Sequence, residues 1–150
     1  MLRIGTFTGY NAIKMAEIIA AGGQIDTIEM NIQYQKIAQE NFQKYGFDDR
    51  IQLIKANARE EITKLNKIYD LIYLHADKLY DQYYYDNCIP ILKSGGILLA
   101  DNVLWVAQVL TSEDPKSQVL NAFNKQLKID NCVSQVLLPL RDGCTIVRKN

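Results

Sequence analysis

The side chains best suited to chemistry follow two strongly apolar runs of the chain. His75 and Lys78 come after the first of these runs, and Asp101 and Asn102 come directly after the second. Adjacent carboxylate and amide oxygens can bind a hard divalent cation, and a nearby imidazole or amine can add a ligand and a proton acceptor. An Asp-Asn pair is also a common turn or helix cap, a single histidine is often structural and a single lysine is usually solvated. The sequence therefore indicates a metal-assisted acid–base site and leaves these structural alternatives open.

A second set of candidates surrounds a glycine-containing turn near the N-terminus. The turn at 5–9 follows a strand-like run and precedes a helix, so its backbone N–H groups can approach a polar or anionic ligand. Glu29 ends the next strand-like run about 20 residues beyond Gly9, where a carboxylate commonly accepts hydrogen bonds from ribose hydroxyls. Together these features favour a nucleoside cofactor, although the turn can serve tight geometry alone and Glu29 can be a solvated strand end.

An alternating series of strands and helices must hold these candidates. Apolar residues at 12, 15, 16 and 19 have helical spacing, and the glycines at 22 and 23 are expected to end that helix. The nearly all-apolar runs at 69–74 and 97–100 are typical of parallel strands covered on both faces, with a turn at 93–96. The sequence predicts strands at 2–4, 24–29, 51–54, 69–74, 97–100, 133–138 and 145–148, and helices at 11–21, 32–45, 79–92 and 116–128.

The order of these elements predicts one α/β domain over residues 1–150. The expected architecture is a doubly wound, Rossmann-like sheet, mostly parallel, with an antiparallel hairpin strand at the C-terminal end. In such sheets ligands bind beyond the carboxyl ends of the strands, which is where both sets of candidates lie.

The composition narrows the possible partners. Lys plus Arg and Asp plus Glu each number 17, so a net charge of +0 gives no general attraction to nucleic acid or to an anionic membrane, and we expect neither. The same balance allows a homodimer. The single histidine, His75, excludes metal sites that need two. Cys88, Cys132 and Cys144 are odd in number and widely spaced, so they are expected to be reduced, mostly buried thiols. No apolar run is long enough to span a bilayer, and we expect a cytoplasmic protein.

Six short segments, taken in order, form a recognisable set. They are Ile4-Gly5-Thr6-Phe7-Thr8-Gly9-Tyr10, Thr27-Ile28-Glu29-Met30-Asn31, Ala76-Asp77-Lys78, Leu92-Lys93-Ser94-Gly95-Gly96, Ala100-Asp101-Asn102-Val103-Leu104-Trp105 and Leu137-Leu138-Pro139-Leu140-Arg141-Asp142-Gly143. Along the whole chain these segments resemble the cation-dependent, S-adenosylmethionine-using O-methyltransferases of the catechol and caffeoyl-coenzyme A type. The resemblance implies a class I methyltransferase sheet and methyl transfer to a hydroxyl of a small, catechol-like molecule.

The resemblance also implies a role for each matching residue. The residues implied to bind S-adenosylmethionine are Gly5, Thr6, Phe7, Thr8, Gly9, Tyr10, Asn11, Glu29, Met30, Asn57, Ala58 and His75. The residues implied to ligate a divalent cation (Mg²⁺, Mn²⁺ or Ca²⁺) are His75, Asp101 and Asn102, and Lys78 is implied to be the catalytic base. A cation that binds the substrate hydroxyl lowers its pKa, the lysine accepts the proton, and the oxyanion attacks the sulfonium methyl.

The chain departs from the family pattern at a few positions. Arg3 stands where the family has an acidic residue close to the cofactor's ammonium group, and His75 replaces an aspartate ligand, which shifts the expected metal preference toward Mn²⁺, Fe²⁺ or Zn²⁺. Val106 and Ala107 replace glycines that commonly follow the tryptophan. Family members carry a helical segment before the first strand, so this chain is expected to be a fragment or a shortened member. The alternative function is a shortened, catalytically impaired methyltransferase-fold protein with a binding or structural role.

Overall fold

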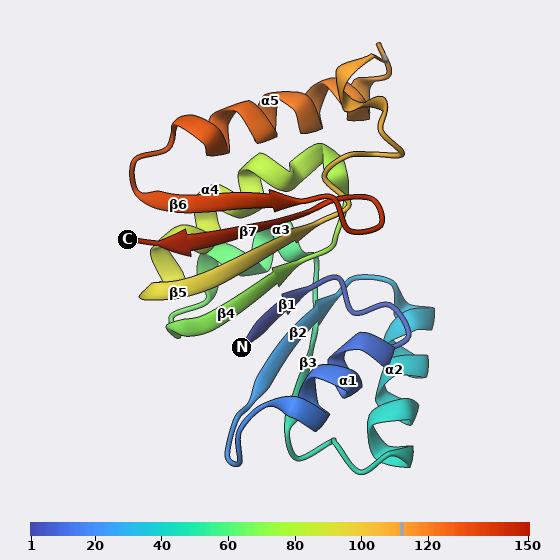
Figure 1. The fold of residues 1–150 in the computed structure, drawn as a ribbon. Helices are drawn as coiled ribbons and strands as arrows, with labels where there is room; N and C mark the ends of the chain where they lie inside the picture. Colours follow the sequence, from blue (N-terminus) through green and yellow to red (C-terminus); the bar gives the residue numbers. More distant parts are fainter. Residues whose placement is uncertain (112) are drawn as a thin grey trace. The chain divides into compact units, whose positions relative to one another are not determined.

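The chain folds into two compact α/β units, Met1–Leu65 and Asn66–Asn150. Their elements are shown in Figure 1, a computed structural model that describes residues 1–111 and 113–150. The prediction of one domain over 1–150 stays a prediction. Each unit is described by itself below.

Three parallel strands carry the first unit. They are β1 (Leu2–Ile4), β2 (Ile25–Glu29) and β3 (Ile51–Lys55), in the order β3-β2-β1. Helices α1 (Tyr10–Ile18) and α2 (Ile32–Lys44) pack on β2 and β3. A core of buried apolar side chains lies between these helices and strands. It consists of Ala12, Ile13, Ala16, Ile25, Ala38, Phe42 and Ile51. Removing this surface from water holds the unit together.

Local chemistry fixes where the helices of this unit begin and end. The Asn31 side chain caps α2 by accepting the backbone N–H groups of Gln33 and Tyr34 at 2.9 and 3.3 Å. Helix α1 ends at Ile18 because Ile19 is extended, so the prediction that the glycines at 22 and 23 end it is wrong. The short helix α3 (Ala58–Glu61) and the 3₁₀ turn η1 (Ile62–Lys64) were not predicted from the sequence.

The second unit contains both parallel and antiparallel strand pairs. Its strands are β4 (Tyr69–Leu74), β5 (Leu92–Asp101), β6 (Val133–Leu138) and β7 (Cys144–Lys149), in the order β4-β5-β7-β6. β4 and β5 are parallel, whereas β7 runs antiparallel to both β5 and β6. The predicted antiparallel C-terminal hairpin is therefore confirmed. The helical segments are η2 (Lys78–Tyr80), α4 (Asp81–Ile91), η3 (Gln108–Leu110) and α5 (Pro115–Ile129).

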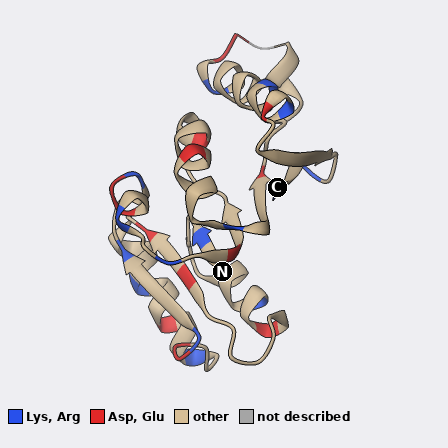
Figure 2. Ribbon diagram, turned by 90° about the vertical axis from the view of Figure 1, so that its left-hand side faces the viewer, with Lys and Arg blue, Asp and Glu red and all other residues tan. Residues whose placement is uncertain are grey.

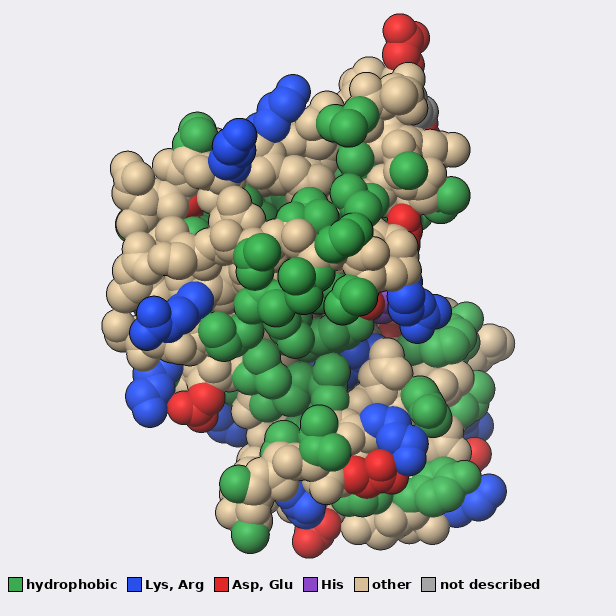
Figure 3. Space-filling model, viewed as in Figure 1, with side chains coloured by type: hydrophobic (Ala, Val, Ile, Leu, Met, Phe, Trp, Pro, Cys, Tyr) green, Lys and Arg blue, Asp and Glu red, His purple; other side chains and the backbone are tan. Residues whose placement is uncertain are grey.

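Burial alternates along the central strands of this unit. Ile72, Leu74 and Leu98 are fully buried, while Leu71, Ile97 and other residues between them are only partly buried. One sheet face is thus packed, and the other presents apolar side chains, which gather over these strands in the space-filling view (Figure 3).

Two expectations for this unit need correction in detail. The predicted turn at 93–96 lies inside β5 as an irregularity, because Tyr69 pairs with Leu92 but Leu71 pairs with Ile97, and Gly95 has a φ of 78°. Of the cysteines, all free, only Cys88 is buried; Cys132 is exposed and Cys144 is intermediate, so the expectation of mostly buried thiols is wrong.

Charged residues are distributed over both units without separation by sign. Figure 2 shows acidic and basic positions interspersed along the elements, in keeping with equal totals of 17. In the ranges 1–111 and 113–150, no helix is long and apolar enough to cross a membrane. The predictions of no nucleic-acid partner, no membrane partner and a cytoplasmic location stay predictions.

Candidate functional site

The turn after β1 is tied to the neighbouring strand. The backbone N–H groups of Gly5 and Thr6 both donate to the carbonyl of Ile28, at 3.1 and 3.2 Å, and the buried Thr6 hydroxyl lies 2.7 Å from that of Thr27. Gly9 has a φ of 82°, and a Cβ there would lie 2.6 Å from the Phe42 ring. Tight geometry therefore explains Gly9, and the turn is held in one conformation at the carboxyl end of β1.

Glu29 connects three strand ends of the first unit. One carboxylate oxygen accepts the Phe7 N–H at 2.9 Å and the other accepts the Asn31 N–H at 2.8 Å. The Glu29 carbonyl accepts the Ala56 N–H at 3.1 Å, which places the following Asn57 and Ala58 beside it. The predicted cofactor residues of this unit thus meet at the carboxyl ends of β1, β2 and β3.

Large apolar side chains remain uncovered at this edge. Phe7 is 56% exposed, Tyr10 64% and Met30 63%. Asn11 is exposed, Ala58 is buried, and Asn57 caps α3 through the Arg59 N–H. Exposed rings and a thioether around a fixed carboxylate are what a flat, partly polar ligand needs.

A hollow of about 330 Å³ adjoins the turn. Residues from the turn and from helices α1 and α2 line it, namely Thr8, Tyr10, Ile13, Lys14, Glu17, Asn41 and Tyr45. Asn41 donates to the Thr8 carbonyl at 2.8 Å, so α2 also supports the turn. Arg3, the residue of β1 that departs from the family pattern, is buried at 2% exposure and is not among the residues that line this hollow.

In the second unit, His75 and Asp101 lie side by side at the ends of β4 and β5. His75 Nδ1 is 3.2 Å from Asp101 Oδ2, a close contact that is not aligned as a hydrogen bond. The Tyr73 hydroxyl donates to the same oxygen, and the Asn102 N–H donates to Oδ1 at 2.9 Å. The contact with His75, the Tyr73 hydroxyl and the Asn102 N–H hold the pKa of Asp101 well below its usual range, although burial opposes them.

Lys78 is buried, in contrast to an ordinary solvated lysine. Its side chain is 6% exposed, and Nζ donates to Asp81 Oδ2 at 2.7 Å and to the Asp101 carbonyl at 2.6 Å. Asp81 is fully buried at the start of α4. Burial raises the pKa of Asp81 to about 6, although the Lys78 ammonium acts in the opposite direction.

The loop after β5 has a strained backbone. Asn102 has a φ of 56°, and Trp105, Val106 and Ala107 follow with φ of 48°, 54° and 61°. Asparagine tolerates such values, whereas they are unfavourable for tryptophan and alanine and most of all for β-branched valine. The Asp142 carboxylate accepts the Val106 N–H, and the Asp142 carbonyl accepts the Leu104 N–H at 2.9 Å, so the β6–β7 connection supports this loop.

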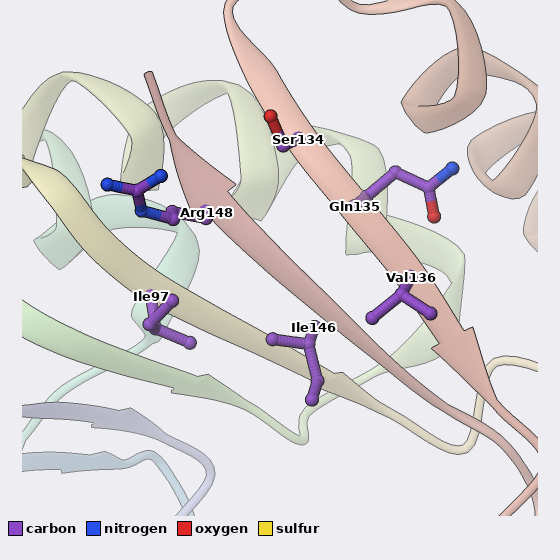
Figure 4. Close-up of a pocket in the computed structure, with 6 residues that line it drawn as sticks. All are labelled: Ile97, Ser134, Gln135, Val136, Ile146 and Arg148. Atoms are coloured by element: carbon purple, nitrogen blue, oxygen red, sulfur yellow. The ribbon is translucent and has the colours of Figure 1, made fainter.

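A second hollow, of about 290 Å³, lies on the partly exposed face of β5, β7 and β6. Figure 4 shows its lining side chains, which are Ile97, Ser134, Gln135, Val136, Ile146 and Arg148. Its floor is apolar, and it offers no acid or base apart from an arginine that stays protonated. We therefore assign the chemistry to the strand ends.

The residues His75, Asp101 and Asn102 suit a divalent cation in donor type. Two ligand atoms bound at about 2.1 Å and at a right angle are about 3 Å apart, close to the separation of His75 Nδ1 and Asp101 Oδ2. Among the described residues no group of three His, Cys, Asp or Glu side chains could hold a metal, so the Asn102 amide would have to supply the third ligand.

Sequence reasoning missed two residues of this site. Tyr73 lies in β4 and His75 follows the end of that strand two residues later, so period-two alternation continued from the strand predicts both side chains on one face. Asp81 lies one helical turn after Lys78, a spacing at which side chains meet. Both signals were present, but neither identifies a functional residue alone.

Comparison with known proteins identifies the family. The profile of the O-methyltransferase family matches residues 1–150. The chain belongs to the O-methyltransferase family. It is 29% identical to caffeoyl-CoA O-methyltransferase of Populus kitakamiensis, over 99% of this chain and 68% of that protein. It is 28% identical to tapetum-specific methyltransferase 1 of Arabidopsis thaliana, with the same coverage of 99% and 68%.

Solved structures agree with this assignment. The SAH-bound methyltransferase of Podospora anserina is 28% identical, with a TM-score of 0.92 over 99% of this chain and 70% of that chain. The predicted family, enzyme class and Rossmann-like fold are confirmed, and the alternative of a binding or structural protein is not favoured. The chain spans about two thirds of the length of the curated relatives it matches. The roles of individual site residues stay predictions.

Proposed function

We propose that this O-methyltransferase transfers a methyl group from S-adenosylmethionine to a hydroxyl of a small, catechol-like molecule, assisted by a divalent cation. The observation that carries the proposal is the buried Lys78 amine, fixed 2.6 Å from the Asp101 carbonyl beside the His75–Asp101 pair. A base next to side chains that can ligate a cation, here His75 and Asp101, is suited to removing a proton from a bound hydroxyl.

The first unit is proposed to bind the cofactor. Glu29 keeps lone pairs beyond the two it uses for the Phe7 and Asn31 N–H groups, and these can accept hydrogen bonds from ribose hydroxyls. The exposed side chain of Met30 offers a surface for the adenine. The Podospora relative, crystallised with SAH, supports this cofactor class.

The second unit is proposed to hold the cation through His75, Asp101 and Asn102. When bound, a divalent cation supplies Lewis acidity that lowers the pKa of a substrate hydroxyl. An imidazole in place of a third oxygen ligand favours Mn²⁺, Fe²⁺ or Zn²⁺ over Mg²⁺ or Ca²⁺.

Lys78 is proposed to accept the hydroxyl proton. The Lys78 ammonium that pairs with Asp81 must first release a proton to solvent. The neutral amine then has two N–H donors and one lone pair, and two acceptors lie beside Nζ, Asp81 Oδ2 and the Asp101 carbonyl. The lone pair is then left for the substrate. The oxygen that loses its proton attacks the sulfonium methyl, and the sulfonium sulfur leaves as the neutral thioether of S-adenosylhomocysteine.

The names of the relatives and the chemistry of His75, Asp101 and Asn102 support the proposed substrate class. The Populus relative is a caffeoyl-CoA O-methyltransferase, and caffeoyl groups carry adjacent ring hydroxyls. We propose a small hydroxylated aromatic molecule as substrate.

The test is release of S-adenosylhomocysteine from S-adenosylmethionine, with Mn²⁺ or Mg²⁺ and a panel of catechols. Metal-dependent release by the parent, reduced at least 100-fold in Lys78→Ala, supports the proposal. Lys93→Ala, which removes an exposed lysine paired with Asp70, is the matched control and retains activity. Equal release by the parent and Lys78→Ala would contradict the assigned base.

A further inference from the structure

Asp81 has an unusual environment for a carboxylate. Its side chain is fully buried, Oδ2 accepts Lys78 Nζ at 2.7 Å, and Oδ1 has no hydrogen-bond partner among the described residues. A buried carboxylate with one unsatisfied oxygen lowers stability, so such a group calls for another explanation than folding.

The geometry around Lys78 supplies that explanation. The amine nitrogen is tetrahedral, and one of its four directions is taken by the carbon stem. Asp81 Oδ2 and the Asp101 carbonyl take two more, at 2.7 and 2.6 Å. Two acceptors from different elements, α4 and β5, therefore fix the fourth direction.

We propose that Asp81 is a positioning residue that orients Lys78 Nζ so that its remaining direction faces the substrate hydroxyl. Asp81 touches neither substrate nor cofactor and acts through Lys78. The inference rests on the proposed role of Lys78 as base. It adds a residue that none of the six family-like segments contains.

The alternative is a purely structural ion pair. Such a pair would affect folding but not the reaction rate of the folded enzyme. The two roles separate when kcat, KM and folding are measured on the same variants, because a misaligned base lowers kcat while substrate and cofactor still bind.

The experiment compares Asp81→Asn and Asp81→Leu with the parent. The amide keeps an acceptor oxygen and the leucine keeps only bulk, so kcat should fall about threefold in the first and at least 30-fold in the second, with KM and the SAH dissociation constant within twofold. Asp70→Asn, which alters the exposed Lys93–Asp70 pair, is the control and leaves kcat unchanged. A folded Asp81→Leu variant with the parent's kcat would overturn the proposal.

A second readout does not depend on turnover. The rate at which acetic anhydride acylates Lys78, followed by peptide mass spectrometry, should rise at least fivefold in Asp81→Leu and less in Asp81→Asn, because the amine loses a fixed acceptor. An unchanged rate in both variants would overturn the proposal. If the parent shows no methyl transfer but this rate rises, the proposed function fails while the Lys78–Asp81 coupling stands.

Discussion

The Tyr85 hydroxyl donates a 2.7 Å hydrogen bond to the Asp130 carboxylate, joining α4 to the residue that directly follows α5. This bond, together with the Cys132 N–H, lowers the pKa of Asp130, and burial acts in the opposite direction. Burial, followed by the bond to Asp130, raises the pKa of Tyr85. Tyr85 also packs against Phe123 of α5, with ring centroids 5.9 Å apart, so both contacts link α4 to the C-terminal half of α5 and the residue after it.

Tyr85→Phe should reduce the free energy of unfolding by about 1–2 kcal/mol at pH 7, since the lost hydrogen bond is to a charged acceptor. The folded-state pKa of Asp130 is lowered, so its contribution is present above the unfolded value near 4 and disappears as the pH falls below it. The difference between parent and variant should therefore shrink below about pH 4. Urea unfolding from pH 3 to pH 8 measures it. Tyr45→Phe, at an exposed tyrosine, is the control, and a pH-independent difference would contradict the assignment.

Val106→Gly should stabilise the protein. A valine at φ 54° is strained, and glycine removes that strain at the cost of a more flexible unfolded chain. The expected gain is about 1 kcal/mol, or roughly 2–4 °C in Tm. Thermal unfolding monitored by circular dichroism gives the result. Val136→Gly, in strand β6, should be destabilising, and a lower Tm for Val106→Gly would show that the loop is not strained.

His75→Asp should change the metal preference. The parent is expected to bind Mn²⁺ at least tenfold more tightly than Mg²⁺, and an aspartate in place of the imidazole should shift the ratio toward Mg²⁺. Electron paramagnetic resonance of free Mn²⁺, with Mg²⁺ as competitor, reports both affinities. Asp70→Asn should leave the ratio unchanged, whereas the same ratio in His75→Asp would remove His75 from the proposed ligand set.

Replacing both members of the Lys78–Asp81 pair should cost less stability than replacing one. Lys78→Met or Asp81→Leu alone leaves an unpaired buried charge and is expected to cost about 3–5 kcal/mol. The double variant buries two apolar side chains and should be within about 1 kcal/mol of the parent, with no methyl transfer. Denaturant unfolding of all four proteins completes the cycle. Additive losses in the double variant would indicate that the two residues are not coupled.

Much of the framework could be predicted from the sequence, because apolar runs and helical spacing identify elements directly. His75, Lys78 and Asp101 could also be expected to meet, since the carboxyl ends of adjacent parallel strands share one edge of a sheet. The hydrogen bonds that Tyr73 makes to Asp101 and Lys78 makes to Asp81 could not be predicted from the sequence. A partly buried tyrosine is ordinary in a strand, and an aspartate in the first turn of a helix usually faces solvent, so neither Tyr73 nor Asp81 signals its partner.

Backbone details were also beyond sequence reasoning. Tyr69 of β4 pairs with Leu92 of β5, and Leu71 pairs with Ile97, so residues 93–96 lie between two paired positions of β5. The sequence does not indicate that this segment stays within the strand. Helix α1 ends at Ile18 because Ile19 adopts an extended conformation, before the chain reaches the glycines at 22 and 23. Both outcomes are decided by packing rather than by local propensity.

The most direct test is a calorimetric titration of S-adenosylhomocysteine into the protein, with and without Mn²⁺, beside Glu29→Ala and the control Glu40→Ala, at an exposed residue of α2. We predict micromolar binding by the parent and by Glu40→Ala, and at least 30-fold weaker binding by Glu29→Ala, which corresponds to about 2 kcal/mol. Equal binding by the folded Glu29→Ala variant, or none by the parent, would contradict a cofactor site at the carboxyl ends of β1, β2 and β3.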